Sequence, residues 1–235
     1  HQNVTDLNLT GQCIDGECYD EVLFHNLESY IDNLQQDGII VLHTIGSHGP
    51  TYYNRYPAEF KKFTPTCDTN EIQSCTQQQL TNTYDNTILY IDYMVDKTIK
   101  LLQSKQDKFT TSLVYLSDHG ESLGEKGLFL HGLPRAIAPE EQTKVPMVWW
   151  LSEGFMKSRM INSDCLKEKS SDALSHDNLF HSVLGLMDVQ TSIYQQSLVQ
   201  LGHGKYQQRI QATVTGKTSY IAVELAGDKE ERSEE

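Results

Sequence analysis

The chain has 235 residues with 19 Lys or Arg and 32 Asp or Glu, which gives a formal net charge of −13. This length suits one domain with its own hydrophobic core. The acidic balance argues against nucleic-acid binding, which needs a basic surface to neutralise phosphates. Periodic apolar runs argue against a disordered chain, and none of them approaches the roughly 20 residues of a membrane span.

The N-terminus indicates that this sequence is part of something longer. The chain begins with His1 rather than Met, and no signal-peptide pattern follows it. We therefore expect a piece of a longer protein, with further elements of the fold upstream.

Apolar patterning predicts the secondary structure in chain order. Helical periodicity over residues 23–34 precedes a strand at 39–43, and a longer helical stripe over 80–102 precedes a strand at 112–116. A third strand at 145–151 is followed by a helix over residues 179–187. The strands are near-continuous apolar runs, as in a parallel sheet covered on both faces. The sequence therefore predicts an α/β fold with a mainly parallel central sheet flanked by helices.

The cysteines leave two interpretations open at this point. Two close pairs, Cys13 with Cys18 and Cys67 with Cys75, are separated by four and seven residues, so neither is a CxxC motif. A disulfide in each polar, turn-rich segment would pin a loop that lacks a core of its own, which favours an oxidising compartment. The alternative is a set of free thiols in a cytosolic enzyme. Cys165 has no obvious partner.

Histidines collect where the predicted strands end. His48 follows the first strand, Asp118 and His119 follow the second, and His131 follows a glycine-punctuated loop. Ligand crevices of open α/β sheets lie beyond the carboxyl ends of the strands. These positions therefore predict a functional site.

The adjacent Asp118 and His119 are the sharpest feature of this predicted site. A carboxylate and an imidazole at a strand end can both reach one cation, and nitrogen with oxygen ligands suits Zn²⁺ better than Mn²⁺. Since two ligands are too few, His48 and His131 are candidates for a second metal or for the phosphate oxygens of a substrate. The alternative is that Asp118 caps a turn and His119 is a satisfied core residue. Structural roles are expected for the other histidines, which are His1, His25, His43, His176, His181 and His203.

Five motifs in order resemble one family. They are GSHGPTYY at residues 46–53, FTPTC at 63–67, YDNT at 84–87, SDHGESLGE at 117–125 and LHG at 130–132. Together they resemble the periplasmic catalytic domain of lipid A phosphoethanolamine transferases, a group that includes the mobile colistin-resistance enzymes. This group belongs to the alkaline phosphatase/sulfatase superfamily. The resemblance runs from about residue 4 to residue 197.

The resemblance implies a role for each motif residue. Asp118 and His119 match the family's zinc ligands, while His48, Glu121 and His131 match residues around the substrate phosphoethanolamine or a second zinc. The two cysteine pairs match family disulfides. Residues 1–198 would then be a partial catalytic domain, and residues 199–235 an atypical, solvated or frayed tail with one strand-like run at 220–223.

The resemblance also implies a reaction. The family transfers phosphoethanolamine from phosphatidylethanolamine to lipid A phosphates through a phosphothreonine, and this modification gives polymyxin resistance. Zinc lowers the pKa of the threonine hydroxyl and offsets phosphoryl charge. The nucleophilic threonine, a glutamate ligand and the membrane anchor are expected upstream, so this piece alone should bind metal weakly and turn over negligibly. We expect the periplasmic domain of a monomeric inner-membrane protein.

Two rival functions remain. One is another zinc-dependent enzyme of the superfamily, a phosphoglycerol transferase or a sulfatase. The other is a non-catalytic module that binds metal or lipid headgroups. After Ser197 the sequence leaves the family pattern and lacks the C-terminal cysteine that pairs with the counterpart of Cys165.

Overall fold

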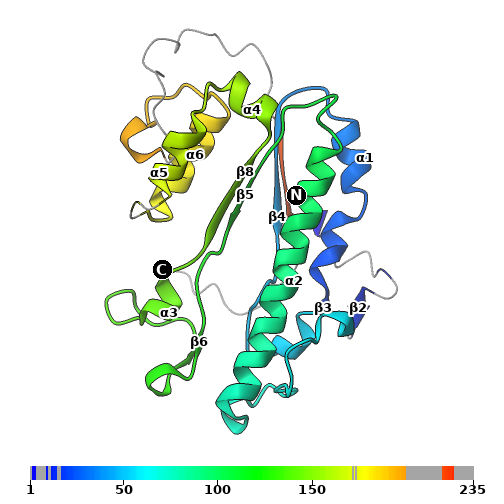
Figure 1. Ribbon diagram of the computed structural model, residues 1–235, viewed down its shortest axis with the longest axis vertical. Coiled ribbons are helices and arrows are strands. Elements are labelled where there is room, and N and C mark those ends of the chain that lie inside the picture. The colour runs from blue at the N-terminus through cyan, green and yellow to red at the C-terminus, as the bar shows by residue number, and fades with distance from the viewer. Residues whose placement is uncertain are drawn as a thin grey trace.

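Helices and strands alternate along the part of the chain that the computed structural model describes (Figure 1). The described residues are 2–3, 9, 12–14, 17–170, 172, 174–199 and 219–224. Most of the tail predicted from residue 199 lies outside them, as do His1 and His203. Among the described helices, none combines the length and the apolar character that a membrane span needs.

The described strands form four small sheets. In a parallel sheet, β9 (Ser219–Glu224) lies between β1 (Gln2–Asn3) and β4 (Gly38–His43). The antiparallel pairs are β5 (Ser112–Leu116) with β8 (Met147–Leu151), β2 (Cys13–Ile14) with β3 (Glu17–Cys18), and β6 (Ser122–Leu123) with β7 (Phe129–Leu130).

All three predicted strands are present, as β4, β5 and β8. The third begins at Met147 rather than at residue 145, because Pro146 has no N–H for a ladder and its carbonyl accepts the N–H of Ser117 at 3.5 Å. The strand-like run at residues 220–223 is β9. Apolar runs of this length therefore locate the strands to within about two residues.

The direction of one strand pair differs from the prediction. Parallel pairing joins β1, β9 and β4, whereas β5 and β8 run antiparallel, with Ser112 opposite Leu151 and Leu116 opposite Met147. Residues 117–146 turn back through the β6–β7 hairpin and the short helix α3 (Glu140–Thr143), and they do not make the helical crossover that parallel neighbours need. The α/β class itself is confirmed.

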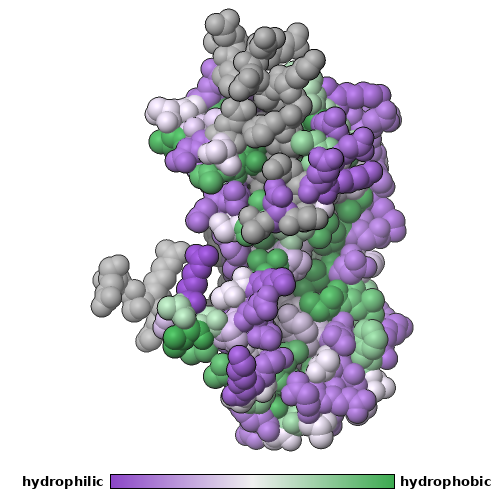
Figure 2. Space-filling model, turned by 60° about the vertical axis from the view of Figure 1, so that its left-hand side comes forward, coloured by the Kyte–Doolittle hydropathy of each residue, from purple (hydrophilic) through white to green (hydrophobic). Residues whose placement is uncertain are grey.

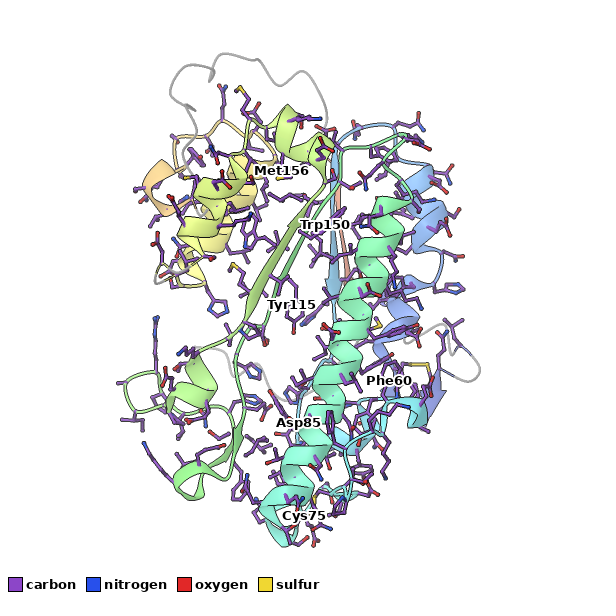
Figure 3. All side chains as sticks on the ribbon, viewed as in Figure 1. Phe60, Cys75, Asp85, Tyr115, Trp150 and Met156 are labelled. Carbon is purple, nitrogen blue, oxygen red and sulfur yellow. A yellow bond between two sulfur atoms is a disulfide. The ribbon has the colours of Figure 1, made fainter. Side chains whose placement is uncertain are left out.

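The two faces of the β5–β8 pair have different neighbours. One face carries Val114 and Trp149, which pack on a core formed by Phe155, Ile161 and Leu186 of the α4–α6 region. Figure 3 shows Tyr115 and Trp150 on the side toward the long helix α2.

Parts of the described strands are more exposed than expected for a sheet that is covered on both faces, as the sequence predicted. Val41 of β4 is 48% exposed and Val148 of β8 is 43% exposed. Figure 2 shows apolar residues at the surface in the middle of one face, among hydrophilic ones.

The longest helix, α2 (Gln77–Gln103), crosses the molecule in front of β4 (Figure 1). Its N-terminus is a capping box in which the Thr76 hydroxyl accepts from the N–H of Gln79 and the Gln79 side chain accepts from the N–H of Thr76. The remaining α-helices are α1 (Leu27–Asp32), α4 (Glu153–Ser158), α5 (Ser163–Lys169) and α6 (Asp177–Leu186). Short 3₁₀ helices include Asp20–Phe24 and Tyr52–Asn54.

The buried face of α2 is partly polar, and it holds one of the sequence motifs in place. Asn86 accepts the N–H groups of Lys62 and Phe63, both at 2.8 Å, and the Thr83 hydroxyl accepts the N–H of Cys67 at 2.7 Å. Asn86 of the YDNT motif and Thr83, directly before that motif, therefore anchor the FTPTC segment to the helix.

Both predicted disulfides are present. Cys13 is bonded to Cys18, and Cys67 is bonded to Cys75 at the foot of α2 (Figure 3). Cys165 is a half-buried free thiol. The pairing indicates an oxidising compartment, as the cysteine spacing suggested.

Candidate metal centre

Three histidines from separate strand-end segments converge. His48 follows β4, His119 follows β5 and His131 follows β7, and one ring nitrogen of each lies within 4.8 Å of those of the other two. The rings of His119 and His131 are stacked with centroids 3.8 Å apart, and His48 lies edge-on to both. The loops predicted to share a site therefore do meet.

Hydrogen bonds engage the same nitrogen in each of the three rings. Nδ1 of His48 lies 2.7 Å from the carbonyl oxygen of Gly49, and Nδ1 of His119 lies 3.1 Å from that of Gly120. Nδ1 of His131 lies 3.0 Å from a carboxylate oxygen of Glu121. Because all three partners are acceptors, each Nδ1 carries the proton and each Nε2 keeps a free lone pair. Three imidazoles prepared in this way form a nitrogen donor set for a metal ion.

Asp118 lies at the margin of this centre and outside the set of three. Its side chain is 79% exposed, and one oxygen accepts the N–H of His119 at 3.0 Å. The same oxygen is 3.9 Å from Nε2 of His119, so a cation on that nitrogen is within reach of the carboxylate. The structure thus brings Asp118 and His119 together, and His48 and His131 lie beside His119 in the same centre.

Glu121 is buried behind His131. Its side chain is only 4% exposed and accepts three hydrogen bonds, from Nδ1 of His131, from the N–H of Gly49 at 3.3 Å and from the hydroxyl of Tyr52 at 2.9 Å. Burial, and next the charge of Glu121, raise the pKa of Tyr52, so its hydroxyl stays protonated as a donor. Glu121 therefore contacts the far side of His131 rather than the centre.

Side chains that sequence reasoning missed hold the loop that carries His48. Asp20, 3% exposed, accepts the N–H groups of Ile45 at 2.9 Å and Gly46 at 3.0 Å. Burial raises the pKa of the Asp20 carboxyl, while the two backbone bonds favour its charged form. The guanidinium of Arg55 donates to the carbonyl of His48 at 2.9 Å. No local pattern marks these partners, because Asp20 lies 25 residues from Ile45 in the sequence.

The loop that carries Asp118 and His119 is fixed at its ends. The N–H of Gly120 donates to the carbonyl of Gln142 at 3.0 Å, and the Gln142 side chain donates to the Ser122 hydroxyl at 2.9 Å. A side chain at Gly120 would place its Cβ 2.0 Å from the carbonyl oxygen of Glu141, so this close approach requires glycine.

Three of the other described histidines lie outside the cluster, and one of them contacts the loop that carries Asp118. His176 is the N-cap residue of α6, and its Nε2 also donates to the carbonyl of Ser117 at 2.9 Å, directly before Asp118. His181 is buried in α6 and accepts the N–H of Gln195, while His25 ends a 3₁₀ helix.

The fold and the cluster define an α/β domain with a candidate metal centre where its strands end. The chain belongs to the Sulfatase family, which matches residues 2–189. This result confirms the superfamily that the motifs indicated.

Individual relatives indicate a narrower class of protein than the Sulfatase family does. Over 196 residues the chain is 69% identical to phosphoethanolamine transferase EptA of Salmonella typhimurium, covering 83% of this chain and 36% of that protein. It is 38% identical over 174 residues to phosphatidylethanolamine transferase Mcr-1 of Escherichia coli, covering 74% and 31%. The chain thus spans about a third of the length of these curated relatives.

A solved structure supports the fold. The soluble domain of lipooligosaccharide phosphoethanolamine transferase A from Neisseria meningitidis superposes with a TM-score of 0.82 at 48% identity, covering 85% of this chain and 60% of that one. The predicted fold class is confirmed by this match.

Proposed function

We propose that this chain is part of the catalytic domain of an enzyme that transfers phosphoethanolamine from phosphatidylethanolamine to lipid A phosphates, and so confers polymyxin resistance. The observation that carries the proposal is the convergence of three histidines, each with an acceptor at Nδ1, in a chain 69% identical to EptA. The proposed location is the periplasm, as part of a monomeric inner-membrane protein.

The residues present fit a zinc ion. Tetrahedral zinc with bonds of about 2.1 Å needs ligand atoms about 3.4 Å apart. The ring nitrogens of the three histidines lie within 4.8 Å of one another, which is close enough for cations to bind among them. We propose Asp118 and His119 as ligands, with His48 and His131 binding a second ion or the phosphoethanolamine headgroup. When bound, zinc lowers the pKa of a coordinated hydroxyl and offsets charge on phosphoryl oxygens.

The protein residues supply the rest of the site. The imidazoles of His48, His119 and His131 supply nitrogen donors to the centre, and Glu121 holds His131 through its Nδ1. A chain of net charge −13 must offset a phosphate's charge locally, and these imidazoles with a bound cation provide that offset. We assign the nucleophile to none of this chain's threonines, because none lies in the matching motif.

A chimera tests the proposal. The matching residues of Salmonella EptA are replaced by those of this chain, and transfer of ethanolamine-labelled phosphate from phosphatidylethanolamine vesicles to lipid A is measured. We expect transfer and polymyxin resistance, and a loss on the order of 100-fold or more for His119→Ala, which removes a metal ligand. His25→Ala, at an exposed histidine outside the cluster, is the matched control.

The same assay separates the rivals. With labelled phosphatidylglycerol or a sulfate ester as the donor, transfer of glycerol phosphate or sulfate instead of phosphoethanolamine identifies a different superfamily enzyme. A folded, membrane-inserted chimera that transfers no label contradicts the proposed function and favours a binding module. Transfer that His119→Ala leaves unchanged contradicts the proposed metal ligand.

A further inference from the structure

We propose that Tyr52 is a positioning residue: through Glu121 it holds His131 in the one tautomer and orientation in which Nε2 can bind a cation. The inference rests on the proposed function, because it concerns the same metal centre. It assigns Glu121 to the support of a ligand rather than to the cation itself.

Tyr52 is a fixed point in this part of the fold. The residue is 1% exposed and packs in a core with the Cys67–Cys75 disulfide, Ile72, Leu80 and Leu123. Its ring meets that of Tyr84 edge-on with centroids 5.6 Å apart. A hydroxyl on so constrained a ring has one direction in which to donate, and Glu121 lies there at 2.9 Å.

Glu121 depends on that donor. One carboxylate oxygen receives the Tyr52 hydroxyl, and the other receives both the Gly49 N–H and Nδ1 of His131. A buried carboxylate that loses a donor carries the full desolvation cost of the unpaired oxygen, so it turns toward another donor. Removal of the Tyr52 hydroxyl therefore releases the oxygen that holds His131.

His131 is the one of the three imidazoles that relies on a side chain. Nδ1 of His48 and of His119 bonds the backbone carbonyl of the following residue, which no substitution removes. Nδ1 of His131 bonds a carboxylate whose own position is set by Tyr52. Tyr52 consequently controls one ligand and leaves the tautomers of the other two unchanged.

Two measurements on the 235-residue chain test the inference. Two-bond ¹H–¹⁵N spectra of the imidazoles, recorded without metal at a pH where the rings are neutral, report each tautomer, and a Zn²⁺ titration reports affinity. Tyr52→Phe keeps the ring and deletes the hydroxyl. We expect a mixture of tautomers at His131, unchanged spectra for His48 and His119, and zinc binding about tenfold weaker.

Tyr90→Phe is the matched control. Tyr90 is also 1% exposed, and its hydroxyl accepts the N–H of Glu21, outside the histidine cluster. This variant should retain the wild-type spectra and zinc affinity. A Tyr52→Phe protein that also retains both overturns the inference.

A second variant covers the case in which Tyr52→Phe does not fold. Glu121→Ala removes the acceptor of Nδ1 of His131, so we expect a mixture of tautomers at His131 and zinc binding about 10- to 100-fold weaker. A Glu121→Ala protein whose His131 keeps both its proton on Nδ1 and its zinc affinity overturns the inference. Wild-type protein that binds no zinc contradicts the proposed metal centre of this chain instead, while the tautomer spectra still decide the role of Tyr52.

Discussion

The two loops that bring His48 and His119 into the centre are held in opposite ways. The first loop, residues 44–50, is tied by buried charged groups from outside it, Asp20, Arg55 and Glu121. The tip of the second loop is tied by its own atoms: the Ser117 hydroxyl donates to the carbonyl of His119, whose N–H bonds Asp118. The first loop is thus preorganised by the fold, whereas the second loop is fixed only at its ends and its tip is left for a bound cation to complete.

The largest expected effect is a difference in stability between two variants, one that affects each loop. Asp20→Ala leaves two buried N–H groups without an acceptor, at about 1–3 kcal/mol each, so we expect a loss of about 3 kcal/mol in the free energy of unfolding. Asp118→Ala, at a 79% exposed side chain, should change it by less than about 0.5 kcal/mol. Urea unfolding of both variants measures the contrast.

Asp20→Asn sharpens this test. The amide keeps one acceptor oxygen, so its loss should be smaller than that of Asp20→Ala. Equal losses for Asp20→Ala and Asp118→Ala would show that the first loop is not held from outside.

Zinc binding should protect the second loop more than the first. At a free zinc concentration 100 times the dissociation constant, binding adds about 2.7 kcal/mol to the stability of the folded state. We expect hydrogen-exchange protection to rise in residues 117–122 and to stay unchanged in residues 44–50. A chelator should abolish the gain in stability and the gain in hydrogen-exchange protection, and Asp118→Ala should reduce both. Equal new protection in both loops would contradict the comparison.

High pH should weaken the region around the first loop. Burial raises the pKa of Tyr84 to about 12, and burial also raises the pKa values of Tyr52 and Tyr90. Below pH 10 these tyrosines are neutral in both states. Above pH 10 the unfolded state loses their protons first, so stability falls by about 1.4 kcal/mol per pH unit for each one until its folded pKa is reached.

Unfolding curves between pH 9 and 12, with tyrosinate absorbance, measure this slope. Tyr84→Phe should reduce it. An identical slope in Tyr84→Phe and wild type would show that Tyr84 ionises equally in both states.

The sequence was sufficient for what depends on local pattern. Apolar runs located β4, β5 and β8, and a glycine beside each histidine marked the turns that bring His48, His119 and His131 to strand ends. Both disulfides join residues close in the chain. These features need little information from distant residues.

What the sequence could not supply is set by tertiary contact. Asp20 lies 25 residues from its partner Ile45 in the sequence, and Tyr52 lies 69 residues from its partner Glu121. Neither residue carries a local signal for that contact. The antiparallel direction of β8 depends on the path of residues 117–146, which apolar content does not encode. The helices α3, α4 and α5 have only four to seven residues each, too few to show a periodic stripe.

The smallest effect concerns a side-chain anchor of the second loop, which bonds the residue just before the tip. His176 is exposed and donates from Nε2 to the carbonyl of Ser117, so its loss removes a single solvent-accessible hydrogen bond. We expect His176→Ala to cost about 0.5 kcal/mol of stability and to weaken zinc binding about twofold, since Asp118 follows directly. His25→Ala, at another exposed histidine, should do neither. If His176→Ala instead cost as much as Asp20→Ala, the second loop would also be held from outside, and the contrast between the two loops would fail.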